Sequence, residues 1–149
     1  MSVHFREITR DNFNECVRLK VGEHQKFVAP NVYSIAQSRV EPERVPLAVY
    51  CGDSMVGFVM YSFDYEEKEL HLSRIMIDLQ HQHKGYGKAS LELIRQIGMC
   101  EPGIEKIGLS TRPDNVQAIR VYEKFGFKGT GILDDGEEIF VLELARSSE

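Results

Sequence analysis

The sequence of 149 residues predicts one mixed α/β domain, because short apolar strands alternate with amphipathic helices along its whole length. Three consecutive strands over residues 45–78, followed by two strand–helix steps, carry most of this prediction. The expected order is strand, helix, helix, three strands, helix, strand, helix and two strands. We therefore predict a mixed, mostly antiparallel sheet of six to seven strands flanked by about four helices, in a single domain over residues 1–149.

In the first half of the chain, VHFREIT alternates apolar and polar residues as a half-buried strand does. The next helix is expected to be capped by Thr9 or Asp11 and to run as far as Val21. A second helix is predicted around residues 33–41, between two prolines. Gly52 lies in the turn GDS between the first two strands of the antiparallel run, and DYEEKE forms the next turn.

In the second half, the segment GYGKASLELIRQIGM has apolar residues at helical spacing and predicts a helix that starts near Gly85. The segment IEKIGLST follows as a short strand, and PDNVQAIRVYEKFGF predicts a helix that ends at Gly126. The last two strands are expected on either side of the turn DDGE.

Composition excludes several classes of protein. With 18 Lys and Arg against 23 Asp and Glu, the net charge of -5 argues against a nucleic-acid partner and slightly favours cationic ligands. No stretch approaches the ~20 apolar residues of a membrane span, so we expect a cytoplasmic protein with no membrane partner. Cys16, Cys51 and Cys100 show no CxxC spacing, and we interpret them as reduced core or half-buried thiols.

The stretch QHQHKGYGKAS places Gly85 and Gly87 at the expected start of a helix, where free N–H groups and the helix dipole favour an anion. A dinucleotide fingerprint would need a third glycine at Ser90, and the Walker A pattern is absent. A pyrophosphate is the natural ligand, whereas a tight turn with no ligand is the alternative. His81 and His83 have no third ligand nearby in the sequence, so no metal site is predicted.

Two motifs resemble the GNAT family of N-acetyltransferases. Gln82-His83-Lys84-Gly85-Tyr86-Gly87 matches the family's Q/R-x-x-G-x-G/A signature between the fourth strand and the third helix, and NVQAIRVYEKFGF resembles the family's later asparagine, tyrosine and GF segment. The element order agrees with the family fold along nearly the whole chain. Within the family, the segments EHQKFVAPNVYSIAQS, PLAVY and RIMID resemble microbial spermine/spermidine (diamine) N-acetyltransferases.

The resemblance implies that acetyl-CoA binds where the fourth and fifth strands splay apart, with CoA as a product. The backbone of Ile75, Met76 and Ile77 would pair with the pantetheine arm. Only the backbone of Met76 is implied, so substitution of its side chain is expected to be nearly silent. Asn115 would also bind near the pantetheine, and the pyrophosphate would be held by the loop residues Gln82, His83, Lys84, Gly85, Tyr86, Gly87 and Lys88.

The same match makes Tyr122 the candidate catalytic acid, although a tyrosine at such spacing can also simply pack on the core. By the resemblance, eukaryotic polyamine acetyltransferases place a glutamate base on the fourth strand where this chain has Ser73, so the sequence does not identify the base here. Glu23, Glu41 or a water chain could serve, and both glutamates are candidates for binding the amine, with a solvated helix face as the alternative.

These observations predict an acetyl-CoA-dependent N-acetyltransferase that acts on a primary amine of a polyamine such as spermine, spermidine or a diamine. Two alternatives stay open: another small amine or a protein amine as the acceptor, and a CoA-binding module without catalysis. The resemblance also implies a homodimer, because the last two strands often mediate pairing in this family and EEIFVLEL is apolar enough to do so.

Overall fold

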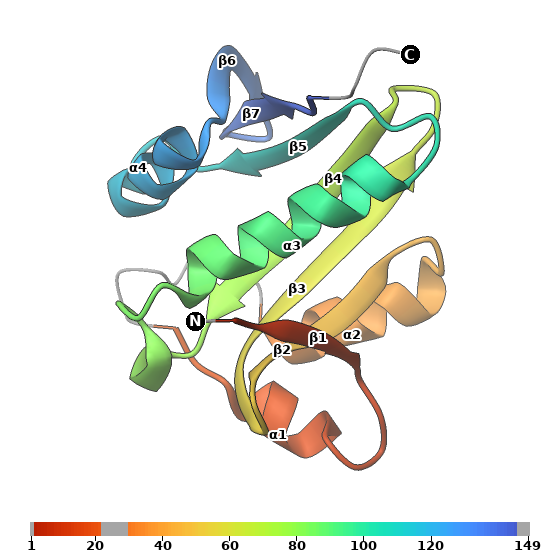
Figure 1. Ribbon diagram of the computed structural model, residues 1–149, viewed down its shortest axis with the longest axis vertical. Coiled ribbons are helices and arrows are strands. Elements are labelled where there is room, and N and C mark those ends of the chain that lie inside the picture. The colour runs from red at the N-terminus through yellow and green to blue at the C-terminus, as the bar shows by residue number, and fades with distance from the viewer. Residues whose placement is uncertain (1, 22–29, 146–149) are drawn as a thin grey trace. The chain divides into compact units, whose positions relative to one another are not determined.

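In the computed structural model, residues 2–21 and 30–145 are described, and they form the element order expected from the sequence (Figure 1). The fold class is thereby confirmed: the described residues form a seven-stranded mixed sheet with four α-helices. The elements are β1 (His4–Glu7), α1 (Phe13–Arg18), α2 (Asn31–Val40), β2 (Val45–Cys51), β3 (Ser54–Asp64), β4 (Glu69–Ile77), the short 3-10 helix η2 (Leu79–His81), α3 (Tyr86–Cys100), β5 (Lys106–Thr111), α4 (Val116–Phe125), β6 (Lys128–Asp134) and β7 (Glu137–Glu143).

The strands follow the order β1-β2-β3-β4-β5-β7-β6, in which β4 and β5 are parallel. Parallel neighbours need a crossover connection, and α3 supplies it between these two strands. Their register runs from Glu69 opposite Lys106 to His71 opposite Gly108. Both strands continue past this paired stretch, β4 to Ile77 and β5 to Thr111.

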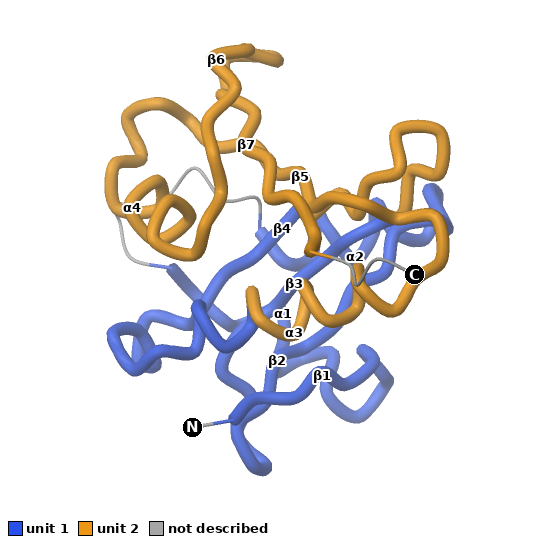
Figure 2. The backbone as a smooth tube through the Cα atoms, turned by 45° about the horizontal axis from the view of Figure 1, so that its top comes forward, with its two compact units in different colours: residues 1–62, 73–90 blue, residues 63–72, 91–149 orange. Residues whose placement is uncertain are grey.

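The chain forms two compact units, which Figure 2 distinguishes by colour: unit 1 comprises residues 1–62 and 73–90, and unit 2 comprises residues 63–72 and 91–149. Strands β3 and β4 and helix α3 each contribute residues to both. One domain over the whole chain stays a prediction.

The core of unit 1 lies between the sheet and the first two helices. Cys16 of α1 and Ile35 of α2 pack on this core, whose strand residues alternate along the sequence as one face of a sheet requires. Its buried members are Cys16, Ala48, Tyr50, Met55, Phe58, Met60 and Met76. Burial in this core raises the pKa of the Cys16 thiol to about 12, so this cysteine is an unreactive packing residue.

The predicted start of the first helix was wrong. Helix α1 begins at Phe13 after Asn12, not after Thr9 or Asp11, and ends at Arg18, short of Val21. Asn12 occupies the N-cap position, but its side chain makes no capping bond: it accepts from the Thr9 N–H at 2.7 Å and donates to the distant Tyr50 hydroxyl at 3.2 Å.

Two smaller expectations also need correction. Helix α2 begins at Asn31, two residues earlier than predicted. The side-chain amide of Asn31 donates to the Cys16 carbonyl oxygen at 2.9 Å. This buried bond ties the start of α2 to the end of α1. Cys100 is exposed at the end of α3 and is not half-buried.

Unit 2 is built around a glycine of α3. A Cβ at Gly98 would lie 3.1 Å from Leu144 and 3.6 Å from Leu70, so glycine lets the helix lie close to the sheet. Helix α4 ends at Gly126, whose φ of 121° suits glycine, as predicted. The β6–β7 turn has positive φ at both Asp135 and Gly136, which is the geometry of a tight hairpin.

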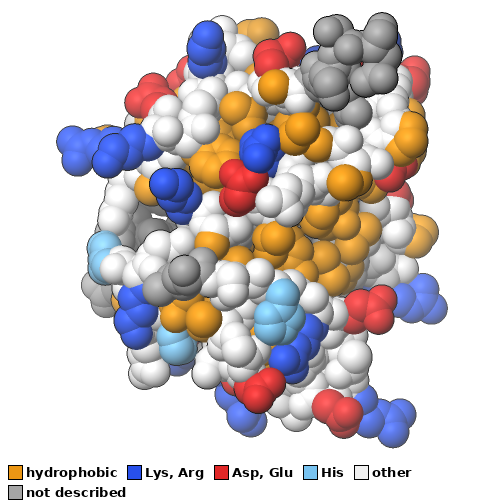
Figure 3. All heavy atoms as spheres, in the orientation of Figure 1, with side chains coloured by type: hydrophobic (Ala, Val, Ile, Leu, Met, Phe, Trp, Pro, Cys, Tyr) orange, Lys and Arg blue, Asp and Glu red, His pale blue; other side chains and the backbone are white. Residues whose placement is uncertain are grey.

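Both acidic and basic side chains appear on the face of the molecule drawn in Figure 3. Across residues 2–21 and 30–145, no helix combines the length and apolar character that a membrane crossing requires.

Met76 is 6% exposed and belongs to the core of unit 1, so substitution of its side chain will not be silent for stability. We expect Met76→Ala to lower the free energy of unfolding by ~2–5 kcal/mol, because it removes buried contacts and leaves a cavity. The matched Met76→Leu should cost less than ~1.5 kcal/mol. Urea unfolding followed by circular dichroism measures both, and equal costs would show that this position is not tightly packed.

Candidate active site

The end of β4 is held by its neighbours in unit 1. A Cβ at Gly57 of β3 would collide with the carbonyl oxygen of Met76, so this glycine lets the two backbones approach. The Ile77 carbonyl oxygen accepts from the Gln82 amide at 3.0 Å. Of the three residues expected to pair with pantetheine, Ile77 therefore has its carbonyl oxygen engaged by the first residue of the signature loop.

Asp78 was not singled out by the sequence analysis, yet it organises the chain just after β4. Its carboxylate accepts from the N–H groups of Lys20, at 2.9 Å, and Gln80, at 3.3 Å. The Leu79 N–H donates in turn to the Lys20 carbonyl oxygen at 2.6 Å. The two bonds made by Lys20 join the segment after α1 to the entrance of the signature loop, and the bond from Gln80 is local to that entrance.

The signature loop leads into α3 through two residues with left-handed backbone angles, His83 with φ of 64° and Gly85 with φ of 86°. The Ala89 N–H donates to the Gly85 carbonyl oxygen at 3.1 Å, and the N–H groups of residues 86–88 precede this bond at the start of the helix. Lys84 and Lys88 are exposed beside them. This end of α3 is suitable for binding an anion, because it combines free N–H groups, the dipole of a 15-residue helix and two cations.

Tyr86 lies within the signature but is directed at the sheet. The pKa of the Tyr86 phenol is raised mainly by a hydrogen bond with Cys51 and, to a smaller extent, by burial. Its ring centroid lies 6.3 Å from that of His81. The side chain of Tyr86 thus anchors the first turn of α3 and leaves its backbone for a ligand.

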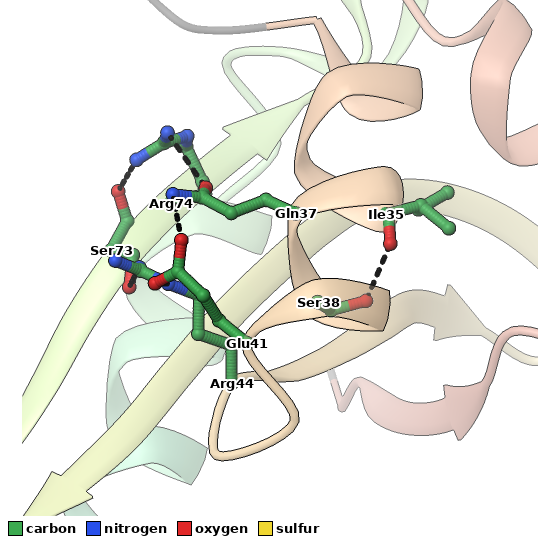
Figure 4. A network of polar contacts seen from close by, with 7 residues as sticks. All are labelled: Ile35, Gln37, Ser38, Glu41, Arg44, Ser73 and Arg74. Carbon is green, nitrogen blue, oxygen red and sulfur yellow. Dashed lines mark hydrogen bonds and ion pairs between the residues drawn. The ribbon is translucent and has the colours of Figure 1, made fainter.

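Glu41 belongs to a polar network between the end of α2 and β4 (Figure 4). Its carboxylate accepts from Arg44 Nε at 2.9 Å and from the Gln37 amide at 3.2 Å. These bonds, first of all the one from Arg44, lower the pKa of Glu41. A carboxylate with a lowered pKa is a weaker base, so Glu41 is less suited to remove the proton of an amine than the sequence suggested.

Ser73, which occupies the place of the expected glutamate base, is part of the same network. Arg44 Nη1 donates to the Ser73 hydroxyl at 2.9 Å, and Arg74 Nη1 donates to the Ser73 carbonyl oxygen at 2.8 Å. No spacing in the sequence indicates the first contact, because its partners are 29 residues apart. The other candidate, Glu23, lies outside the described residues.

Helix α4 of unit 2 carries the remaining two site residues. Asn115 is its N-cap, and the side-chain oxygen accepts from the Ala118 N–H at 3.5 Å. Tyr122 is half-buried, with its ring edge-on to Phe127 at 5.8 Å between centroids. Burial, and then the negative charge of Glu137, raises the pKa of Tyr122 to about 12. The phenol therefore keeps its proton at neutral pH and can donate a hydrogen bond.

His71 of β4 contacts a carboxylate within unit 2. Its Nδ1 lies 3.2 Å from the carboxylate of Glu69, two residues earlier on β4. Gly108 of β5 provides the room for Glu69, since a Cβ there would collide with the carboxylate.

The acetyltransferase (GNAT) family matches residues 6–127. The chain belongs to the GNAT family. The predicted enzyme class, an N-acetyltransferase, is thereby confirmed.

A spermine/spermidine N(1)-acetyltransferase of Bacillus subtilis (strain 168) is 31% identical over 152 residues, which cover 97% of this chain and 100% of that protein. The fold is shared with two solved structures. A spermidine N-acetyltransferase from Vibrio cholerae in complex with CoA and spermine gives a TM-score of 0.74 at 16% identity, covering 96% of each chain. The PaiA N-acetyltransferase from Thermoplasma acidophilum in complex with coenzyme A gives 0.72 at 18% identity, covering 96% of this chain and 99% of that one.

The two glycines of the signature differ in what they allow. Nothing lies within 4 Å of a Cβ at Gly85, where only the backbone angle restricts the residue, whereas at Gly87 a Cβ would touch Ile77 at 3.9 Å. We expect Gly87→Leu to weaken acetyl-CoA binding by at least ~10-fold, or ~1.4 kcal/mol, because its side chain fills the space before the helix N-terminus.

Gly87→Ala is the matched control, and it should stay within a few-fold of the parent protein because the added methyl group makes only ordinary contact. Titration calorimetry with acetyl-CoA measures both variants. An unchanged affinity in Gly87→Leu would contradict the assignment of the pyrophosphate to this loop.

Proposed function

We propose that this protein transfers the acetyl group of acetyl-CoA to a primary amine of a polyamine. The observation that carries the proposal is the signature loop of unit 1, which follows β4 and presents free N–H groups, Lys84 and Lys88 at the start of α3. The acceptor is proposed from the B. subtilis relative, whose name states spermine and spermidine and which matches nearly the whole chain. The V. cholerae structure, crystallised with CoA and spermine, shares the fold.

In the proposed reaction, the pyrophosphate is bound by residues 82–88 and the pantetheine arm by the backbone of residues 75–77, with Asn115 nearby. An alkylamine has a pKa near that of lysine, ~10.4, and must lose a proton before it can react. Its nitrogen lone pair then attacks the thioester carbonyl carbon, the C–N bond forms, and the oxyanion is stabilised by a backbone N–H such as that of Met76. The C–S bond breaks with its electrons on sulfur, the nitrogen loses its second proton, and CoA leaves as the thiol.

Tyr122 is the proposed donor to the departing sulfur. A phenol with a pKa of about 12 is a weaker acid than an ordinary thiol, whose pKa is ~8.5. Its contribution is therefore a hydrogen bond that strengthens as negative charge builds on the sulfur, more than an early proton transfer.

We expect Tyr122→Phe to lower kcat by ~10²-fold while the affinity for acetyl-CoA changes little, because the contact forms mainly in the transition state. Steady-state kinetics and calorimetry on the same preparation separate the two quantities. The ring still packs against Phe127 in the variant, so stability should be kept. An unchanged kcat would remove Tyr122 from the reaction.

An amine panel tests the acceptor. With saturating acetyl-CoA, release of free thiol should be fastest with spermine, spermidine and diamines, and slow with amino acids, aminoglycosides and peptide amines. Good turnover of an amino acid, aminoglycoside or peptide amine, with no turnover of any polyamine, would show that the acceptor is not a polyamine. The conclusion that the protein is an acetyltransferase would stand. Binding of acetyl-CoA without transfer to any amine would favour a CoA-binding module.

A homodimer stays a prediction. The sheet ends at β6, which carries the exposed side chains of Ile132 and Leu133 at 60% and 62% exposure. An edge strand with exposed apolar residues is suited to pairing with a second copy.

A further inference from the structure

Helix α2 of unit 1 has the reverse of the usual amphipathic arrangement. A surface helix normally buries its apolar side and exposes its polar side. The buried and half-buried residues of α2 are Asn31, Ser34, Ile35, Gln37 and Ser38, of which only Ile35 is apolar. The exposed residues are Val32, Tyr33, Ala36, Arg39 and Val40, of which four are aliphatic or aromatic. The apolar side of this helix therefore faces solvent.

Polar contacts within unit 1 account for the inner side of α2. The side-chain amide of Asn31 donates to the Cys16 carbonyl oxygen at 2.9 Å. Two turns further along, the side-chain oxygen of Gln37 accepts from Arg74 Nη2 of β4 at 3.5 Å (Figure 4). The inner side thus has polar partners to match its composition. The same reasoning does not explain the outer side, which the described residues of unit 1 leave exposed.

The exposed residues of α2 form two rows, which we call the outer patch. Val32, Tyr33 and Val40 are 53%, 58% and 76% exposed. Seven residues make nearly two helical turns, so Val32 lies in line with Arg39, and Tyr33 lies in line with Val40. Ala36 stands between the two rows, halfway along the patch. Exposed apolar side chains gathered on one surface indicate an interaction site.

The outer patch is complementary to itself in shape. A two-fold axis at Ala36 runs α2 antiparallel to the same helix of a second copy and sets each row against itself in reverse order. Tyr33 then meets Val40 of the second copy, and Val32 meets Arg39 of the second copy. Ala36 meets its own counterpart, where a small side chain allows the helices to approach closely. No charge meets a like charge in this arrangement, because Arg39 faces a valine.

The two ends of α2 are also complementary in charge. Its N-terminus has a positive partial charge, and neither a capping side chain at Pro30 nor an acidic residue in the first turn compensates it. The C-terminus has a negative partial charge, and the exposed Glu43 follows it in the next turn. An antiparallel pair places the C-terminal end and Glu43 of one copy beside the N-terminus of the other. A parallel pair would instead put the two N-termini together.

We infer that the outer patch of α2 is a surface for self-association, on which the same patch of a second copy docks antiparallel. This surface belongs to unit 1, whereas the β6 edge belongs to unit 2, so the two can act separately. One helix face covers much less than the ~1,200 Å² of an ordinary stable interface, and the association is therefore weak and dependent on concentration. The inference does not depend on the proposed function.

Sedimentation velocity over a range of protein concentrations measures the association. Val40→Glu places a carboxylate against Tyr33 of the second copy and should weaken the association by ~10-fold or more. Val32→Lys sets a second cation against Arg39 of the other copy and should weaken the association by a similar factor. Val32→Glu sets a carboxylate against the same arginine, so it should instead tighten the association a few-fold at low salt. High salt should remove this gain, because it screens exposed charges.

The opposite effects at residue 32 are specific to the antiparallel pair, since an apolar surface that binds in any other way would lose affinity with either charge. These side chains are exposed, so the variants should fold as the parent does, which circular dichroism checks. Leu133→Glu is the matched control: it adds the same charge to an exposed leucine of β6. Repeating the series in a Leu133→Glu protein removes pairing through that edge, so the association that persists reports the outer patch.

Each contrary result has one meaning. Unchanged association in Val40→Glu would overturn the inference, as would equal weakening by Val32→Glu and Val32→Lys. A chain that is monomeric at every concentration, or that associates only when Leu133 is intact, would also overturn it. None of these results bears on acetyl transfer, so the proposed function is tested separately by the amine panel.

Discussion

The close approach of β3 and β4 is the constraint on which the rest of the site depends. Gly57 lies against the Met76 carbonyl oxygen, and the Met76 side chain is buried between the strands and the first two helices. With both its backbone and its side chain held, the end of β4 has little freedom. The Ile77 carbonyl oxygen and the Asp78 carboxylate can then position Gln82, Lys20 and Gln80 around it. The start of α3 is therefore built on a rigid strand end, which is what a preorganised anion site needs.

Ser73, earlier on the same strand, contacts basic side chains. A glutamate at the position of Ser73 would receive a proton, but here guanidinium groups from Arg44 and Arg74 bond to this residue. Glu41 is kept ionised by Arg44 and serves to hold that cation. In the proposed reaction, the proton of an amine with a pKa of ~10.4 must therefore leave by a route other than a carboxylate at residue 73.

The raised pKa of Tyr122 has two opposing consequences for its proposed role. Burial and the charge of Glu137 raise its pKa, which guarantees the proton but weakens the acid. A hydrogen bond to a developing thiolate benefits from the first effect and loses little from the second. Asn115 combines the capping of α4 with its proposed contact to the ligand, so α4 depends on this residue for local order as well.

The sequence by itself determined the order of the elements, both glycine turns of the hairpins, the end of α4 at Gly126 and the two family motifs. These features are local: periodicity, turn chemistry and capping act within a few residues. Tertiary structure decided that the first helix starts after Asn12, which bonds to Tyr50, and not after Thr9 or Asp11. It also decided that the Met76 side chain belongs to the core. It also decided that Arg44 meets Ser73, since charges distant in sequence are brought together only by the packing of α2 beside β4.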